Sequence, residues 1–478
     1  MSKELLLEIT NWKLEAKLED IHRYFYPTQA TDLIANGSRC YVIGRKGTGK
    51  TAIAEHLHQE VGYYRFSQKL TFKNFPFNEL YNLQNTKFRA PNQYITLWKY
   101  LIYSSVAKMM SRNENIDSTL RSKLANIYSD DLEQSLPRTI TKWTSSNFEF
   151  KILATGVSTG LARSTNKNDV PWIDKVEILE KMIIDQIDDS FYFIIFDELD
   201  EDYKDTIEHE RREQYTSLLT SLFKAVQDVK SIFRASHFKL LPIIFLRDDI
   251  YSVMQDPDKN KWRDLSIDLD WNVEKIKKLI AFRISRAIDP NGDILSFPEA
   301  WTKVFTEQLV KYGLKQRKRI PAFDFITRSS HIRPRDYVRY MQICADMALE
   351  QDFDTVGPTI TAQADKAFSN YMRSEIEDEI HGFIPEISQI LDTIAHLGKQ
   401  TFTYRDFLSV YKTEVRRGYL PDRNVEFILR VLFHFSVIGN APRRKSIQVF
   451  RYLNKEARIN LDEPFCVHRG LFKAFQIV

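Results

Sequence analysis

Residues 44–51 read GRKGTGKT, which fits the pattern GxxxxGK[ST] at every required position. An apolar run from Arg39 to Ile43 precedes this loop, and the helix-like sequence AIAEHLHQEV follows it. Glycines let such a loop wrap closely around phosphates, and its N–H groups and the helix N-terminus supply positive partial charge. A glycine-rich turn that matches by chance is the alternative, and the strand and helix context disfavours it. We therefore predict a site for ATP, formed by Gly44, Arg45, Lys46, Gly47, Thr48, Gly49, Lys50 and Thr51.

Two residues of this loop have predicted roles of their own. Lys50 is expected to reach the β and γ phosphates, and Thr51 is expected to ligate Mg²⁺.

A second group of candidate residues follows the apolar run FYFIIF at residues 191–196, which ends in the carboxylates DELDED. In a P-loop ATPase we expect this strand to lie beside the P-loop strand. Asp197 would then hold Mg²⁺, directly or through water, and Glu198 would polarise the attacking water. The alternative is that these acids only end a strand, since acidic residues often follow strands.

Two arginine-bearing segments complete the candidate site. LPIIFLRDDIY at residues 241–251 is another strand ending in polar groups, where Arg247 either senses the γ-phosphate or forms a salt-bridged loop. HIRPRDYVRY at residues 331–340 precedes a helix, and an arginine there can neutralise charge on the phosphates. Arg335 is the candidate and Arg333 the reserve, against the alternative of a solvated basic helix start.

The elements that must position these residues are short, buried strands. Arg39 to Ile43, Phe191 to Phe196 and Leu241 to Leu246 are apolar runs typical of parallel strands. Tyr63 to Phe72 and Leu265 to Trp271 are predicted as two more. The pattern predicts a doubly wound α/β fold, a P-loop NTPase core in which ligands bind beyond the carboxyl ends of the strands.

Spacing along the chain predicts three domains. We expect an α/β core at 1–271, a helical lid at 272–380 and a winged-helix domain at 381–478. Nearly 150 residues separate the first two strong strands, far more than a βαβ unit needs, so an insertion is predicted at about 73–175. Within it, Tyr94 to Met110 and residues 115–135 are predicted helices, and Thr141 to Asp169 is predicted as a hairpin or loop.

The C-terminal region is predicted as three helices and a β-hairpin. The helices are Ile384 to Leu397, Tyr404 to Lys412 and Arg423 to Phe435, and the strands are Val437 to Ala441 and Ile447 to Leu453. This order is typical of a winged helix. The third helix is too apolar to read a DNA groove well, so DNA contact and protein packing stay open alternatives. The expected double-stranded DNA contacts are those of the basic turn: Arg443, Arg444 and Lys445.

Composition excludes several other classes of protein. The chain has 478 residues, 43% apolar and 28% charged, which is ordinary for a globular protein. Its three cysteines form no CxxC pair, so neither a disulfide framework nor a structural metal site is predicted. The apolar runs are far shorter than the roughly 20 residues a membrane span requires. We expect a soluble, cytoplasmic protein with no membrane partner.

Charge is unevenly distributed although the net charge is only +4. From His396 to Val478 there are fifteen Lys and Arg against seven Asp and Glu, so the preceding residues are net negative by four. The basic end of the chain is its C-terminus.

The combination of GRKGTGKT, DELD, the arginine of RPRD and a C-terminal winged helix resembles AAA+ ATPases of the origin-recognition and STAND type. More narrowly, the chain resembles the bacterial P-loop ATPases of the Sll1717 family. The resemblance covers about residues 20–478, except for the insertion. It implies that Lys50 and Thr51 act on the phosphates and Mg²⁺, Asp197 on Mg²⁺, Glu198 on the attacking water and Arg335 as the lid arginine.

The sequence departs from that family pattern at the third strand. AAA+ proteins commonly carry Asn, Thr or Ser where this chain has Arg247, so the γ-phosphate sensor is not assigned. Arg234 stands where trans-acting arginine fingers often occur.

The resemblance implies an ATP-driven switch that hydrolyses ATP slowly with Mg²⁺. It suggests a prokaryotic regulatory or antiphage-defence role in which the chain controls a protein effector or acts as a homo-oligomer. An origin-recognition-like DNA-binding ATPase and a nucleotide-binding scaffold without turnover are the alternatives.

Overall fold

The computed structural model describes residues 2–60, 62–72, 92–128, 143, 172–200, 209–235, 238–313, 316–442 and 447–477. The chain forms two compact units. The sheet unit comprises Pro27–Arg45 and Lys50–Leu269. The helical unit comprises Met1–Tyr26, Lys46–Gly49 and Asp270–Val478, so the tip of the P-loop, Lys46–Gly49, groups with it.

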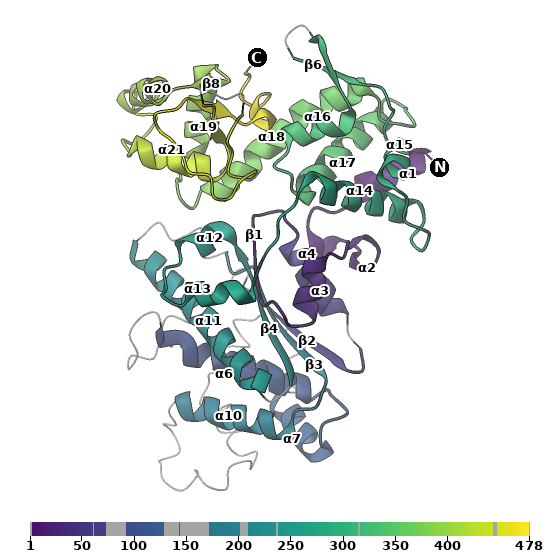
Figure 1. The fold of residues 1–478 in the computed structure, drawn as a ribbon, viewed down its shortest axis with the longest axis vertical. Helices are drawn as coiled ribbons and strands as arrows, with labels where there is room; N and C mark the ends of the chain where they lie inside the picture. Colours follow the sequence, from purple (N-terminus) through teal and green to yellow (C-terminus); the bar gives the residue numbers. More distant parts are fainter. Residues whose placement is uncertain are drawn as a thin grey trace. The chain divides into compact units, whose positions relative to one another are not determined.

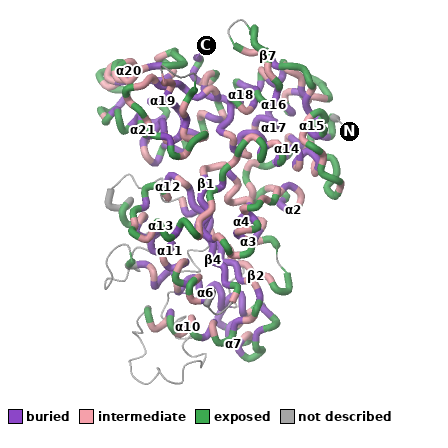
Figure 2. Tube along the Cα trace, viewed as in Figure 1, coloured by how far each residue is buried: buried purple, intermediate pink, exposed green. Residues whose placement is uncertain are grey.

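The sheet unit is built on five parallel strands in the order β2-β3-β4-β1-β5. Figure 2 shows that the three inner strands, β3, β4 and β1, are buried almost throughout, whereas the outer strands β2 and β5 are mostly half-buried. Burial on both faces explains the continuous apolar runs of the inner strands. The predicted parallel α/β core is confirmed. The strands are β1 (Tyr41–Gly44), β2 (Arg65–Thr71), β3 (Phe191–Asp197), β4 (Lys239–Arg247) and β5 (Ser266–Asp268).

One expectation about the sheet is wrong. β3 does not lie beside the P-loop strand, because β4 pairs with β1 on one edge and with β3 on the other. β4 is nine residues long and buried along almost its whole length, so it has the apolar surface required of a central strand.

Helices cover both faces of this sheet, with α4 (Lys50–Gln59) on one side of the strands and α11 (His209–Ala235) on the other (Figure 1). α6 (Ile95–Met110) is buried along nearly its whole length and packs against β2, β3 and α11. Its Trp98 donates a hydrogen bond from Nε1 to the carbonyl of Leu218 in α11, at 2.9 Å. The predicted helix at Tyr94 to Met110 is therefore confirmed, and it belongs to the core of the sheet unit.

The other helices of the sheet unit are α3 (Gln29–Ala35), α7 (Ser118–Tyr128), α10 (Trp172–Gln186), α12 (Asp248–Val253) and α13 (Lys259–Trp262). The predicted hairpin or loop at Thr141 to Asp169 lies outside the described residues, apart from Trp143.

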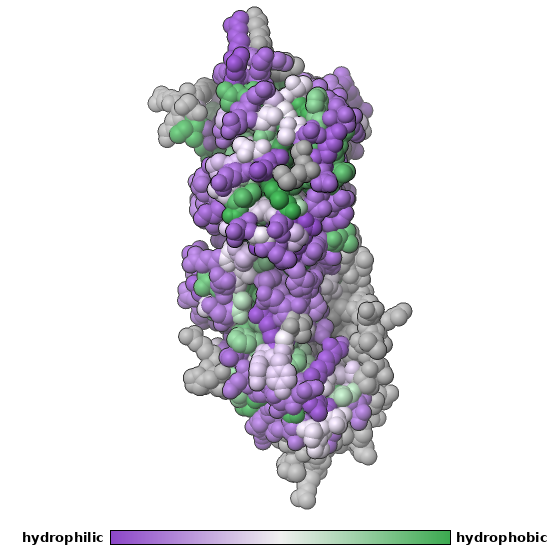
Figure 3. Space-filling view, turned by 90° about the vertical axis from the view of Figure 1, so that its right-hand side faces the viewer, coloured by the Kyte–Doolittle hydropathy of each residue, from purple (hydrophilic) through white to green (hydrophobic). Residues whose placement is uncertain are grey.

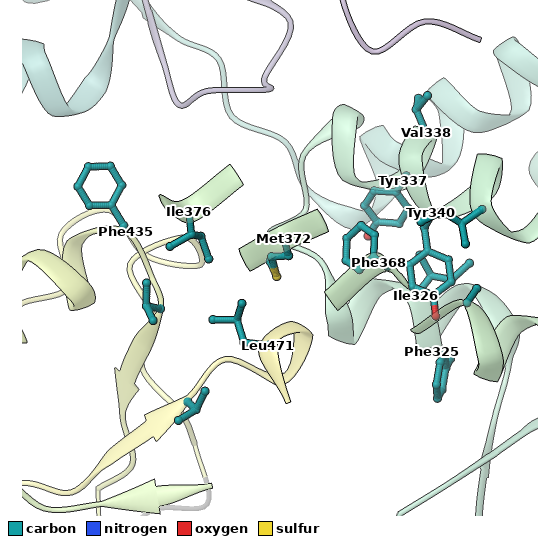
Figure 4. Packing of buried hydrophobic residues seen from close by; sticks show 14 of the residues in the cluster. Phe325, Ile326, Tyr337, Val338, Tyr340, Phe368, Met372, Ile376, Phe435 and Leu471 are labelled. Atoms are coloured by element: carbon teal, nitrogen blue, oxygen red, sulfur yellow. The ribbon is translucent and has the colours of Figure 1, made fainter. Parts of the chain in front are cut away.

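The helical unit begins with α1 (Ser2–Asn11), which packs on α14 (Val273–Ile288) and α17 (Pro334–Glu350). Figure 4 shows how α18 serves two neighbours: Phe368 lies near Tyr340 of α17, whereas Met372 and Ile376 face Leu471 and Phe435. One hydrophobic cluster therefore runs from the first helices of this unit to its C-terminal part. The other elements before residue 381 are α2 (Ile21–Tyr24), α15 (Phe297–Thr302), β6 (Val310–Tyr312), β7 (Lys318–Ile320), α16 (Ala322–Ser329) and α18 (Pro358–Ile380).

The C-terminal part of the helical unit is the predicted winged helix, with α19 (Ile387–Leu397), α20 (Tyr404–Arg416) and α21 (Val425–His434). α20 begins with a capping box, in which Thr403 and Asp406 exchange hydrogen bonds. The backbone N–H and hydroxyl of Thr403 both donate to Asp406 and lower the pKa of its carboxyl group to about 2.

The predicted second strand of the wing is wrong. β9 (Ile438–Asn440) pairs with β10 (Phe465–Val467), which also pairs with β8 (Thr401–Phe402). Of Ile447 to Leu453, only Val449 forms a bridge, with Asn440. The chain then turns, since the N–H of Leu453 bonds to the carbonyl of Phe450, and the run cannot continue as a strand.

No described helix is both long and apolar enough to cross a bilayer. The face drawn in Figure 3 is mainly hydrophilic, with its apolar side chains in small groups.

Candidate nucleotide-binding and catalytic site

The P-loop connects the end of β1 at Gly44 to the start of α4 at Lys50. Gly47 and Gly49 have φ angles of +82° and +94°, which L-residues rarely adopt. A methyl group at Gly49 would meet no atom within 4 Å, so this position requires glycine for its backbone angle and not for space. The loop thus has the conformation that lets successive N–H groups surround an anion.

The Lys50 side chain is held by its own loop. Its Nζ donates to the carbonyl oxygens of Gly44 and Arg45, at 2.8 and 3.0 Å. Burial lowers the pKa of Lys50, partly offset by the negative charge of Asp200. Phosphate oxygens are stronger acceptors than carbonyls for a cation, so this lysine is ready to exchange its partners for a nucleotide.

Asp197, the last residue of β3, is buried and has an unsatisfied oxygen. Its Oδ2 accepts no hydrogen bond from any described residue and lies 3.3 Å from Nζ of Lys69, an ion-pair contact. Asp197 ends β3 and the P-loop follows β1, so the parallel arrangement of β3, β4 and β1 places Asp197 and Lys50 at the same edge of the sheet. Thr51 is in the first turn of α4.

These residues fit Mg²⁺ bound together with a nucleotide. A carboxylate oxygen without a hydrogen-bond donor is a ligand that hard cations prefer. Among the described residues, no cluster of three or more His, Cys, Asp or Glu could hold a metal by itself. Mg²⁺ commonly uses one or two protein ligands and completes its shell with phosphate oxygens and water. Asp197 and Thr51 would be those ligands.

Lys69 is a residue of this site that the sequence analysis missed. It lies on β2, and its Nζ is 2.5 Å from Oε1 of Glu55 on α4 as well as 3.3 Å from Asp197. All three side chains are buried. A lysine within a run predicted to be a core strand was the available signal, because buried lysines need a carboxylate partner.

Glu198 has a positive φ of 57°, in the left-handed region that costs a residue with a side chain about 1–3 kcal/mol. The chain is fixed on both sides of it. The carbonyl of Asp197 accepts from the N–H of Phe72, and the carbonyl of buried Leu199 accepts from the hydroxyl of Tyr215. Such strain persists where surrounding contacts impose it, and it is frequent at functional sites.

Arg247, at the end of β4, is bound by carboxylates. Its Nε and Nη2 donate to the two oxygens of Asp249 at 3.0 and 2.7 Å, and Nη1 lies 3.4 Å from Asp200. Burial would raise the pKa of Asp200, but the charges of Arg247 and Lys50 outweigh it and the pKa is lowered. The structure therefore favours the salt-bridged alternative for Arg247 over the γ-phosphate sensor.

In the helical unit, Arg333 is buried beneath the P-loop tip. Its guanidinium pairs with Asp336 at 2.9 Å and Glu379 at 2.8 Å, and it donates to the carbonyl of Lys46 at 3.2 Å. Burial would lower the pKa of Arg333, but these two carboxylates raise it overall. The residue before it, Ile332, has a φ of 54°, an outlier for a β-branched side chain. Arg333 is therefore not part of a solvated basic helix start, the alternative that the sequence left open.

Arg335 is less buried and shares a carboxylate with the loop. Its Nη1 lies 3.2 Å from Oε2 of Glu375, which is also 3.3 Å from Nζ of Lys46. A Cβ added to Gly47 would lie 3.2 Å from Cβ of Arg335, so the two backbones approach closely. Sequence reasoning missed Glu375 and Glu379, because both lie some 40 residues farther along the chain.

We predict that Arg333→Ala destabilises the helical unit by about 3–5 kcal/mol, because it leaves the carboxylates of Asp336 and Glu379 buried without a cation. Chemical denaturation with and without the substitution measures this. Arg416→Ala, which removes an exposed arginine from the same unit, is the control and should change stability by no more than about 0.5 kcal/mol. Equal effects of the two substitutions would contradict the prediction.

Four other candidates are not placed by the structure. The side chain of Arg234 lies outside the described residues, and so does the basic turn of Arg443, Arg444 and Lys445. Their roles stay predictions.

Comparisons with known proteins agree with parts of this description. The model of a family described as "FunZ-associated C-terminal helical domain" matches residues 274–377. The chain is 22% identical over 397 residues to the "putative transposon gamma-delta 80.3 kDa protein" of Escherichia coli strain K12. That alignment includes 78% of this chain and 51% of the relative, so the chain spans about half the length of the curated protein it matches.

Solved structures with a similar course of the chain include two from Aeropyrum pernix. Its ORC2 protein, solved as ADPNP–ADP complexes, is 11% identical with a TM-score of 0.43, over 96% of this chain and 95% of that one. Its ORC1 protein, solved in complex with DNA, is 11% identical with a TM-score of 0.41, over 97% and 96%. The chain itself has a P-loop on a parallel α/β core, followed by a helical domain and a winged helix.

Proposed function

We propose that this protein is an ATP-driven molecular switch that binds ATP with Mg²⁺ and hydrolyses it slowly. The observation that carries the proposal is the buried Oδ2 of Asp197, which accepts no hydrogen bond from any described residue and lies at the edge of the sheet where the P-loop lysine, Lys50, begins α4. A buried carboxylate oxygen without a hydrogen-bond donor is costly, and a bound cation would satisfy it.

Each residue has a distinct part in this proposal. Lys50 leaves the loop carbonyls and binds the β and γ phosphates, while the loop N–H groups surround them. Mg²⁺ neutralises phosphate charge when it is bound. Glu198 orients and polarises the attacking water. Arg335 leaves its ion pair with Glu375 and pairs with phosphate oxygens instead.

The biological role rests on the resemblance to Sll1717-like and STAND ATPases. It favours a cytoplasmic regulatory or antiphage-defence ATPase, acting on a protein effector or as a homo-oligomer. The long helical unit that follows the core supports a switch more than a metabolic kinase, since it offers a surface that a partner could read.

Calorimetric titration with ATP, with and without Mg²⁺, and a phosphate-release assay on the purified chain test the proposal. We expect Mg²⁺-dependent binding and slow release of phosphate. Binding without release would instead indicate a nucleotide-binding scaffold. Absence of binding at millimolar ATP would overturn the proposal.

Lys69 gives a test of the metal site that does not depend on turnover. In Lys69→Met, Asp197 and Glu55 keep their buried charges without a cation, so we predict a loss of about 3–5 kcal/mol in Mg²⁺-free buffer. Added Mg²⁺ should restore part of that loss, whereas the wild type should respond little. Thermal unfolding over a range of Mg²⁺ concentrations measures this. Lys69→Arg, which keeps the charge, should behave as the wild type does, and an equal Mg²⁺ response of all three proteins would contradict the prediction.

A further inference from the structure

The antiparallel hairpin β6–β7 of the helical unit is strongly basic. Residues 311–320, KYGLKQRKRI, contain five Lys and Arg and no Asp or Glu. In Figure 1 the hairpin extends beyond α16, and Figure 3 shows hydrophilic side chains at this end of the molecule. The described basic residues are all exposed: Lys311, Arg317, Lys318 and Arg319.

The pairing of the two strands separates the hairpin into two faces. Val310 pairs with Ile320 and Tyr312 with Lys318, whereas Lys311 pairs with Arg319. Directly paired residues lie on the same face of a ladder, and successive residues alternate between faces. Val310 is buried and Tyr312 is covered by the guanidinium of Arg328, so this face packs against the unit. The opposite face presents Lys311 and Arg319 to solvent.

This arrangement has no stabilising explanation within the described part of the chain. Like charges directly opposite each other in a sheet are destabilising. None of Lys311, Arg317, Lys318 and Arg319 forms an ion pair or side-chain hydrogen bond with another described residue. Charged side chains on exposed strands also prevent edge-to-edge aggregation, but that function does not require a single sign of charge. Four exposed cations on the described part of the hairpin, with no acidic residue among them, indicate an anionic partner.

We propose that the hairpin β6–β7 binds the phosphate backbone of double-stranded DNA. A two-stranded ribbon fits the major groove of B-form DNA, whereas the major groove of A-form RNA is too deep and narrow. Arg317 and Arg319 have guanidinium groups that can bind phosphates with two parallel hydrogen bonds. This surface is separate from the predicted wing and does not depend on the proposed ATPase activity.

The test is fluorescence anisotropy of a labelled DNA duplex with the full chain at graded salt, without nucleotide. In Lys311→Gln/Arg319→Gln we expect about tenfold weaker binding and a salt slope reduced by about two, as two phosphate contacts are lost. Lys366→Gln/Lys473→Gln removes two exposed lysines elsewhere in the same unit and is the matched control. It should bind as the wild type does.

Three results would overturn the proposal. They are an equal loss in the control, unchanged binding in the hairpin variant, and binding of the wild type to anionic lipid vesicles as strong as to DNA. Loss of binding only in Arg443→Gln/Arg444→Gln would assign DNA to the wing instead. Thermal unfolding checks that each variant is folded. Lys50→Ala should keep DNA binding, so a failure of the ATPase proposal can be distinguished from a failure of the DNA-binding proposal.

Discussion

Replacing Lys50 by alanine is expected to abolish measurable ATP turnover and to weaken ATP binding by at least about 100-fold. The side chain is half-buried, and among the described residues it donates to two carbonyls of its own loop, so its charge is available to the phosphates. Removing one partner of a buried charge pair typically costs about 2–5 kcal/mol, and about 2.7 kcal/mol corresponds to that factor. Titration calorimetry and phosphate release measure the two effects.

The control for this variant is Lys181→Ala, which removes an exposed lysine of α10 in the same unit. It should leave both quantities within the error of the wild type. Because burial lowers the pKa of Lys50, its removal also relieves a buried cation, and the variant should remain folded in thermal unfolding. ATP binding that survives in Lys50→Ala would show that the loop does not bind phosphates as proposed.

Glu198→Gln is expected to reduce turnover by about 100-fold to 1000-fold while ATP binding is retained. A general base or water-orienting carboxylate contributes on this scale, and glutamine preserves the size of the side chain but not its charge. The left-handed backbone at this position is fixed by the contacts of Asp197 and Leu199, so the substitution should not move the neighbouring residues. Single-turnover phosphate release after ATP loading isolates the chemical step.

Asp189→Asn is the matched control, because this exposed carboxylate lies just before the opposite end of the same strand, β3. Its turnover should equal that of the wild type. If Glu198→Gln hydrolyses ATP at the wild-type rate, the carboxylate is structural and another residue activates water.

Much of the sheet unit could be predicted because its information is local. Apolar runs too short for helices and lined with β-branched and aromatic residues identify buried strands such as β3 and β4. The P-loop is likewise a continuous segment in which glycine positions determine the backbone. Strand order is not local, and the expected adjacency of β1 and β3 failed because nothing in either strand encodes that β4 comes between them.

The site was predictable to the same extent. Lys50, Asp197 and Glu198 follow strands, and that position made them candidates. The ion-pair partners of Asp197 and Lys46 were not found, because Lys69 and Glu375 contact them through tertiary packing, each within its own unit. The prediction of the wing's second strand was wrong for a related reason. Phe465–Val467, far along the chain, forms the strand that was expected at Ile447 to Leu453.

α18 makes two kinds of contact within two helical turns. Glu375 and Glu379 bind Lys46 and Arg333 at the P-loop tip, while Ile376 packs toward the winged helix. Residues three and four apart on a helix are separated by about 5 Å along its axis. A phosphate that pairs with Lys46 would therefore remove an ion pair of Glu375, on the same helical turn that packs toward the winged helix. Nucleotide binding and the packing of the winged helix would then be coupled through one helix, with no intermediate element between them.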